Sequence, residues 1–186
     1  MIGFAMCGSY CTHAAALQVL RELCDDGYDV LPIISENVFS TDTRFGTAES
    51  LRQRLGELCR KEIIHDVVSA EPLGPRVKLD MLIICPCTGN TLAKIASGIT
   101  DTAVTMAAKA HLRSDRPLII ALASNDAMSA NLGNIGTLLN RKQVYFVPML
   151  QDDPQNKPHS LVADFSLLRA TINSAKKGIQ YRKIFI

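Results

Sequence analysis

The sequence predicts an α/β fold, a doubly wound parallel sheet arranged as a Rossmann- or flavodoxin-like three-layer sandwich. Apolar runs alternate with amphipathic helical patterns from the first residue onward. Several of these runs are apolar on both faces, as the strands of a buried parallel sheet are. The chain has 186 residues and contains no internal repeat or linker, so we expect residues 1–186 to form a single domain.

The first elements are indicated by short apolar runs and by residues that begin helices. Ile2–Met6 is the first expected strand, and a helix over 13–26 follows it, with Thr12 in position to cap its start. A second strand at 28–34 contains Pro32. Proline lacks the N–H that a central strand needs, so this strand is expected near an edge of the sheet or at a bulge.

The rest of the chain continues the alternation. Two prolines and a glycine predict a loop over 71–75. The other expected elements are a helix opening at Gly46 or Thr47, a weaker strand at 63–68, a strong strand at 80–85, helices at 88–98 and 102–113, a strand at 117–123, a helix that carries Met128 and Leu138, a short strand at 143–147 and a closing helix at 160–176.

Composition argues against several classes of function. Hydrophobic residues make up 47% and charged residues 20%, which is typical of a folded globular chain. A net charge of +2, dispersed Lys and Arg, and no Trp give neither a basic patch nor a stacking platform for nucleic acid. No segment approaches the roughly 20 apolar residues that span a bilayer, and the start of the chain does not resemble a signal peptide. We therefore expect a cytoplasmic protein whose six Cys are reduced thiols.

The most informative stretch runs from Pro86 to Thr91, Pro-Cys-Thr-Gly-Asn-Thr, between a strong strand and a helical pattern. The free N–H groups and positive end of a helix's first turn favour an anion or an electron-rich ring. Gly89 permits close approach of a planar ligand, and packing does not explain Asn90. The stretch therefore predicts a cofactor site with these candidate binding residues: Pro86, Thr88, Gly89, Asn90 and Thr91.

A second loop of this character follows the first strand. Gly8 permits a tight turn, and Ser9 and Thr12 offer hydroxyls beside the first N–H groups of a helix, which suits a phosphate monoester. The three spaced glycines of a dinucleotide fingerprint are missing. Simple helix capping explains this loop about equally well. Ser35 closes the second strand and is expected to project toward the same crevice.

The third loop follows the strand at 117–123 and contains Asn125, Asp126 and Met128. Taken alone, these residues are turn, cap and core residues. Ligands of open parallel sheets bind outside the carboxyl ends of the strands, where the strand order reverses. Because all three loops are expected at that edge, together they favour a binding site.

These motifs resemble the FMN-binding flavoprotein family, which includes homo-oligomeric cysteine decarboxylases and flavin prenyltransferases. The run from Pro86 to Gly98 is similar to the family's Pro-Ala-Ser-Ala-Asn-Thr loop and the Leu/Ile-Ala-Lys-x-Ala-x-Gly that follows it, whereas its Met-Asn-x-x-Met motif survives only as Ser-Asn-Asp-Ala-Met at 124–128. The resemblance implies FMN, with Gly8, Ser9 and Ser35 near its phosphate and ribityl chain and 88–91 along the chain and ring. It also implies a homo-oligomer, a trimer or a multiple of trimers, that binds flavin where subunits meet.

A narrower resemblance to one branch of this family rests on 37–46, 70–75, 151–154 and Lys157-Pro158. It implies a spore-forming bacterium, a mother-cell location, a partner subunit and the oxidation of a dihydropyridine dicarboxylate to an aromatic product. No nicotinamide fingerprint is present, so NADP, if used, belongs to the partner.

A dicarboxylate substrate needs cations and hydrogen-bond donors. Arg44 is the best candidate for carboxylate capture because a guanidinium pairs with a carboxylate through two hydrogen bonds. Asn125 is a candidate for holding the flavin ring or a carboxylate. The weaker candidates are Lys109, His111 and Lys157. A charged loop residue is usually solvated, which weighs against Arg44 as well.

Three functions remain open at this point: a subunit of the dicarboxylate oxidase, an independent FMN-dependent decarboxylase or prenyltransferase, and a binding subunit that has lost flavin. The resemblance places the decarboxylases' catalytic His shortly before the strand at 80–85, where this chain has none, and His65 lies too far upstream. We predict no metal site. A rival hypothesis gathers four cysteines from two strand ends into a metal or redox site, although their spacing is not that of a zinc ribbon: Cys7, Cys11, Cys85 and Cys87.

Overall fold

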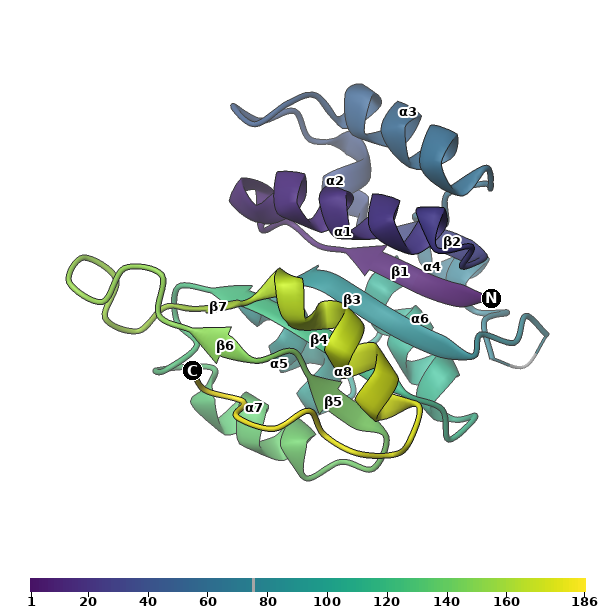
Figure 1. The fold of residues 1–186 in the computed structure, drawn as a ribbon. Helices are drawn as coiled ribbons and strands as arrows, with labels where there is room; N and C mark the ends of the chain where they lie inside the picture. The colour runs from purple at the N-terminus through teal and green to yellow at the C-terminus, as the bar shows by residue number, and fades with distance from the viewer. Residues whose placement is uncertain (75) are drawn as a thin grey trace.

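The computed structural model describes residues 1–74 and 76–186, and in these ranges a seven-stranded sheet lies between layers of helices (Figure 1). Five parallel strands pair in the order β2–β1–β3–β4–β5. They are β1 (Ile2–Met6), β2 (Val30–Ile34), β3 (Met81–Cys87), β4 (Leu118–Ser124) and β5 (Val144–Phe146). This order is flavodoxin-like, and it confirms the doubly wound α/β prediction.

Two short strands extend the sheet in a way that the sequence did not indicate. β6 (Met149–Leu150) and β7 (Leu161–Ala163) pair antiparallel with each other, and β7 pairs antiparallel with the carboxyl end of β4. β5 pairs only with the beginning of β4, at Leu118–Ile120. The hairpin therefore occupies the place beside β4 that β5 leaves open, and it brings the loop at 151–160 to the carboxyl edge of the sheet.

Helices cover both faces of the sheet. α1 (His13–Asp25) and α8 (Leu168–Ala175) pack on one face, where α8 crosses in front of the strands in Figure 1, and α3 (Ala48–Cys59) packs against α1 and β2. The opposite face carries α5 (Gly89–Ser97), α6 (Ala103–Leu112) and α7 (Leu132–Leu139). The short elements are 3₁₀ helices at Tyr10–Thr12 (η1) and Phe165–Leu167 (η2), with α2 (Glu36–Ser40) and α4 (Val67–Ala70).

The core lies along β3 and β4. All seven residues of β3 and six of the seven in β4 are buried, because helices cover both faces of these central strands. Burying one large apolar side chain contributes roughly 1.5–3 kcal/mol before the entropy of folding is counted. The run of apolar residues in each strand is therefore the main determinant of the sheet.

The edge position expected for Pro32 is confirmed, since β2 is the outermost strand at one end of the sheet. The strand expected at 63–68 is wrong. Only Ile64 bridges β2, through its N–H to the Pro32 carbonyl at 3.0 Å and its carbonyl to the Ile34 N–H at 2.8 Å. Asp66 then accepts a hydrogen bond from the Ser69 N–H at 2.9 Å and begins α4, so this N-cap ends the extended segment.

Three other expectations need correction. β3 continues through Cys87, so Pro86 lies in a strand, after a register shift, and the Cys85–Pro86 peptide bond is cis. The closing helix begins only at Leu168, because β7 and η2 occupy 161–167. Met128 was expected in a helix, but it lies in the turn before α7.

The loop expected at 71–75 is a turn over 71–74, and Pro75 lies outside the described residues.

Among the helices in the described ranges, none has the length and apolar character needed to cross a membrane.

Candidate functional site

A cleft of about 710 Å³ opens at the carboxyl edge of the sheet. We call it the carboxyl-edge cleft. Its walls come from the loops that follow β1, β3 and β4, from the segment before α3 and from the β6–β7 loop. The strand order reverses between β1 and β3, which is where flavodoxin-like sheets bind their ligands. The volume lies within the range of about 300–1,000 Å³ that small-molecule sites usually occupy.

Most of the predicted site residues meet in this cleft. The residues that line it are Gly8, Ser9, Thr12, Thr88 and Gly89 from the predicted cofactor set, with Asn125, Arg44 and Lys157 from the substrate set. The other four predicted cofactor residues do not line the cleft. Ser35 caps α2 by accepting a hydrogen bond from the Val38 N–H at 3.4 Å. Pro86 is buried in β3, and Asn90 is exposed on α5. Thr91 is buried, and its hydroxyl accepts a hydrogen bond from the Thr88 hydroxyl at 3.1 Å.

The loop after β1 is held in place by its own hydroxyls. Ser9 Oγ donates to the Ala123 carbonyl at 2.7 Å and so ties this loop to the end of β4. Thr12 Oγ1 donates to the Ser9 carbonyl at 2.8 Å, so Thr12 does not cap α1 through its side chain. Both hydroxyl protons are engaged within the protein. An anion at this loop would therefore be held by the first N–H groups of the η1–α1 segment, at Tyr10 and Cys11.

The loop after β3 begins α5, with Thr88 as its N-cap accepting from the Thr91 N–H at 3.2 Å. Gly89 packs against a polar group of three side chains, which we call the Asp126 cluster: Ser124, Asp126 and Asn131. A Cβ on Gly89 would lie 2.4 Å from Ser124 Oγ, 2.6 Å from Asn131 Nδ2 and 2.7 Å from Asp126 Oδ1. The glycine is required by this contact within the protein, whereas the sequence indicated only a close approach to ligand.

The Asp126 cluster fixes the turn that carries Asn125. Asp126 Oδ1 accepts hydrogen bonds from the Ser124 hydroxyl and from Asn131 Nδ2, the latter at 2.9 Å. These hydrogen bonds, that of Ser124 first, lower the pKa of Asp126, so the carboxylate stays ionised at neutral pH. Asn125 is exposed, and its side chain makes no hydrogen bond with the described residues. Its amide is therefore free to bind a ligand in the cleft.

Two cationic side chains reach the cleft from different loops. The Arg44 guanidinium lies 4.9 Å from the centre of the Phe45 ring, a cation–π contact. Lys157 pairs with Asp152, with 3.0 Å between Nζ and Oδ2, and this hydrogen bond raises the pKa of Lys157. Tyr10, Phe45 and Asp152 also line the cleft. The sequence marked Asp152 only as part of the resemblance at 151–154. It did not indicate that Asp152 lies at the cleft, because that position depends on the pairing of β7 with β4.

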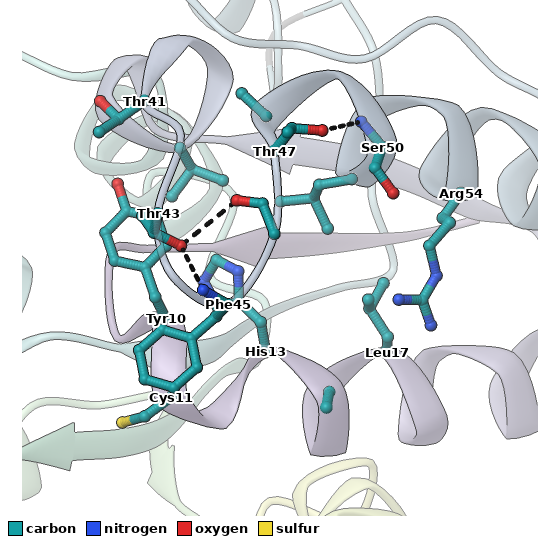
Figure 2. Close-up of a pocket in the computed structure, with 15 residues that line it drawn as sticks. Tyr10, Cys11, His13, Leu17, Thr41, Thr43, Phe45, Thr47, Ser50 and Arg54 are labelled. Atoms are coloured by element: carbon teal, nitrogen blue, oxygen red, sulfur yellow. Dashed lines mark hydrogen bonds between the residues drawn. The ribbon is translucent and has the colours of Figure 1, made fainter.

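A smaller hollow of about 140 Å³ lies beside the cleft, between α1 and the segment that precedes α3 (Figure 2). Figure 2 shows how this segment folds on itself: Thr43 Oγ1 accepts from the Phe45 N–H at 3.1 Å, and Thr47 caps α3 by accepting from the Ser50 N–H at 3.2 Å. Phe45 lines both hollows. The segment is therefore an ordered wall that presents Arg44 to the cleft.

Lys109 and His111 do not reach the carboxyl-edge cleft. Both lie on α6, and Lys109 lines a separate hollow beside α5. His111 is fully buried, with Nε2 2.9 Å from the Pro117 carbonyl. His65 stacks on Phe39 with 3.7 Å between ring centres, outside the cleft. No described His lines the cleft.

Buried His111 predicts a stability that falls as the pH is lowered. Burial lowers the pKa of His111 below the ordinary 6.5, so the unfolded chain takes up a proton that the folded chain refuses. The contribution of neutral His111 to the free energy of unfolding is fully present above pH 6.5. It is lost as the pH falls toward the lowered pKa of the folded state, by up to about 1.4 kcal/mol per pH unit. Urea unfolding of His111→Gln between pH 7 and 5 is expected to show a shallower loss. Substitution of the exposed His159 with Gln is the control, and equal slopes in wild type and His111→Gln would contradict the assignment.

The cysteines give the metal hypothesis no support. Cys7, Cys85 and Cys87 are buried, whereas Cys11 is exposed. Burial raises the pKa of Cys7 to about 11 and also raises the pKa of Cys85 and Cys87, so these thiols stay protonated at neutral pH. Metals bind the thiolate form. Over 1–74 and 76–186, no three His, Cys, Asp or Glu side chains are grouped to hold a metal ion.

Comparison with known proteins adds to this geometry. The model of the Flavoprotein family matches residues 1–165. The B subunit of dipicolinate synthase from Bacillus subtilis (strain 168) is 41% identical over 185 residues, which cover 100% of this chain and 92% of that protein. The crystal structure of the dipicolinate synthase B subunit from Bacillus halodurans C has a TM-score of 0.91 at 39% identity, covering 100% of this chain and 95% of that one.

A more distant structure shares the fold alone. The dodecameric FMN-dependent Ubix-like decarboxylase of Escherichia coli O157:H7 has a TM-score of 0.62 at 19% identity, over 80% of each chain. The family model, in contrast, covers most of the chain, including the loops after β1, β3 and β4 that form the cleft. The chain therefore belongs to the Flavoprotein family.

Proposed function

We propose that this chain, as a single domain of residues 1–186, is the B subunit of a dipicolinate synthase. In this role it works with a partner A subunit to oxidise dihydrodipicolinate to dipicolinate during sporulation, in the mother-cell cytoplasm. The observation that carries the proposal is the 41% identity that extends along the whole chain to the Bacillus subtilis protein. Cations at the carboxyl-edge cleft, contributed by two separate loops, suit a dicarboxylate ligand.

The reaction removes a hydride and a proton from the dihydropyridine ring, which leaves an aromatic pyridine. We assign the hydride acceptor either to NADP held by the partner subunit or to FMN held by this chain. Arg44 binds one carboxylate through its guanidinium, and the Asn125 amide holds a second polar group in the same cleft. The contribution of this chain is to bind and orient the substrate and to keep it away from bulk water.

The described residues fit FMN in chemistry and in volume. The first N–H groups of the η1–α1 segment would hold its phosphate, and Thr88 and Gly89, which line the cleft, would contact the rest of the cofactor. When bound, FMN supplies a two-electron acceptor. Four residues that the resemblance assigns to the cofactor lie outside the cleft of one chain: Ser35, Pro86, Asn90 and Thr91. Their role in binding FMN is part of the proposal. Exposed Asn90 is available to a neighbouring copy, in keeping with the proposed homo-oligomer, a trimer or a multiple of trimers.

One experiment separates this function from its two alternatives. The purified chain is first examined for a flavin absorbance spectrum. Dipicolinate formation with NADP is then assayed in three reactions: this chain alone, this chain with the A subunit, and the A subunit alone as control. We expect dipicolinate only when both chains are present. Equal product from the A subunit alone would assign the chain a role outside catalysis. No product from the pair, together with decarboxylation or prenylation by this chain, would favour the independent enzyme.

A further inference from the structure

Two ordered loops carry the cations that line the carboxyl-edge cleft. Arg44 lies on the segment before α3, which Thr43 holds together, and its guanidinium rests against Phe45. Lys157 lies on the β6–β7 loop, where its N–H donates to the Asp153 carbonyl at 2.8 Å and its carbonyl accepts from the Ser160 N–H at 3.0 Å. Because these loops are hydrogen-bonded internally, little backbone order has to be gained when a ligand binds.

The two cations differ in their partners. Within the described residues Arg44 has no carboxylate within salt-bridge distance. Lys157 pairs with Asp152 at 3.0 Å, with side-chain exposures of 46% and 32%. An ion pair this exposed contributes only about 0–1 kcal/mol, so a ligand carboxylate can replace Asp152 at small cost. Asp152 itself lines the cleft, close to where such a carboxylate would bind.

We propose that Arg44 and Lys157 bind the two carboxylates of one dicarboxylate ligand, and that Asp152 competes for Lys157 until the second carboxylate arrives. The proposal deepens the proposed function and rests on it. A ligand with a single carboxylate engages Arg44, through the two hydrogen bonds that a guanidinium offers, and leaves the Asp152–Lys157 pair intact. A dicarboxylate engages both loops. Asp152 therefore sets selectivity for ligands with two carboxylates by occupying Lys157 against weaker anions.

The test compares two probes, pyridine-2,6-dicarboxylate and pyridine-2-carboxylate, by isothermal titration calorimetry on the purified full chain. Lys157→Gln is expected to weaken dicarboxylate binding about tenfold, the value of a hydrogen bond to a charged group, without changing monocarboxylate binding. Arg44→Gln is expected to weaken both. Asp152→Asn is expected to strengthen dicarboxylate binding by up to about fivefold, because it removes the competitor.

Lys109→Gln and Arg141→Gln remove exposed cations that line a different hollow, and they are expected to leave both affinities unchanged. Weaker dicarboxylate binding by Asp152→Asn would overturn the competitor role. Equal affinity of the wild-type chain for both probes, or binding of neither, would overturn the proposal as a whole.

Two further measurements separate the dicarboxylate site from a phosphate site for FMN and from the proposed function. FMN titration of Arg44→Gln and Lys157→Gln tests whether these cations hold a phosphate, and a loss of FMN affinity with an unchanged ratio between the two probes would overturn the dicarboxylate assignment. Dipicolinate formation with the A subunit is measured separately on the wild-type pair. A pair that forms no product, although the chain shows the expected probe pattern, contradicts the proposed function and leaves the two-loop site intact.

Discussion

Substitution of Asn125 with Asp is expected to lower dipicolinate formation by the reconstituted pair about 100-fold, which corresponds to about 2.7 kcal/mol. Asn125 lines the carboxyl-edge cleft from the turn after β4, and its amide is exposed. Aspartate has the same shape, but it replaces two N–H donors with an acceptor and adds a negative charge. Losing a hydrogen bond to a carboxylate costs about 1.5–3 kcal/mol, and repulsion of an anionic ligand adds to this.

The loss is expected in ligand binding and turnover and not in folding. The Asn125 side chain makes no hydrogen bond with the described residues, so the free energy of unfolding should stay within about 0.5 kcal/mol of wild type. Steady-state kinetics with the A subunit and urea unfolding measure the two quantities. Asn173→Asp, at an exposed position on α8, is the matched control. Wild-type turnover by Asn125→Asp would place the reacting ligand away from this turn.

The parallel sheet could be predicted because its strands carry their own signal. β3 is apolar along its whole length and β4 is apolar up to its last residue, Ser124, and no amphipathic helix has that pattern. The order β2–β1–β3–β4–β5 then places the carboxyl ends of β1, β3 and β4 side by side. Gly8, Thr88 and Asn125 were therefore predicted together, from three loops far apart in the chain, and the structure brings them to one cleft.

What could not be predicted depends on contacts that are distant in sequence. Leu161, Phe165 and Leu168 have helical spacing, yet Leu161 pairs with Ser124 in the sheet and only Leu168 begins α8. This pairing of two- and three-residue strands carries the β6–β7 loop, with Asp152 and Lys157, to the cleft. Strands so short have almost no pattern of their own, because their stability comes from the neighbour they pair with.

Gly89 shows the same limit at a single residue. The sequence indicated that a glycine after β3 allows a ligand to approach the backbone. The structure shows that the neighbour at closest approach is the Asp126 cluster, which comes from the loop after β4. The glycine therefore joins α5 to the turn that carries Asn125, and the two predicted loops form one structural unit.

Substitution of Gly89 with Ala is expected to lower the free energy of unfolding by about 1–3 kcal/mol, the usual cost of overpacking a tight site. The new Cβ would lie 2.4 Å from Ser124 Oγ and 2.7 Å from Asp126 Oδ1. Both atoms end short side chains that hydrogen-bond to each other, so neither can move aside without breaking that bond. Urea unfolding measures the loss, and weaker binding of pyridine-2,6-dicarboxylate is expected with it, because the turn that carries Asn125 shifts.

The control is a glycine on α7, which packs against α5. A Cβ on Gly136, within α7, would meet nothing within 4 Å, so Gly136→Ala should raise stability by about 0.5–1 kcal/mol through helix propensity alone. Adding Ser124→Ala to Gly89→Ala removes the nearest contact and should recover part of the loss, an interaction that a double-mutant cycle isolates. A gain in stability from Gly89→Ala equal to that from Gly136→Ala would mean that the cluster gives way, and Asn125 would then not depend on Gly89 for its position.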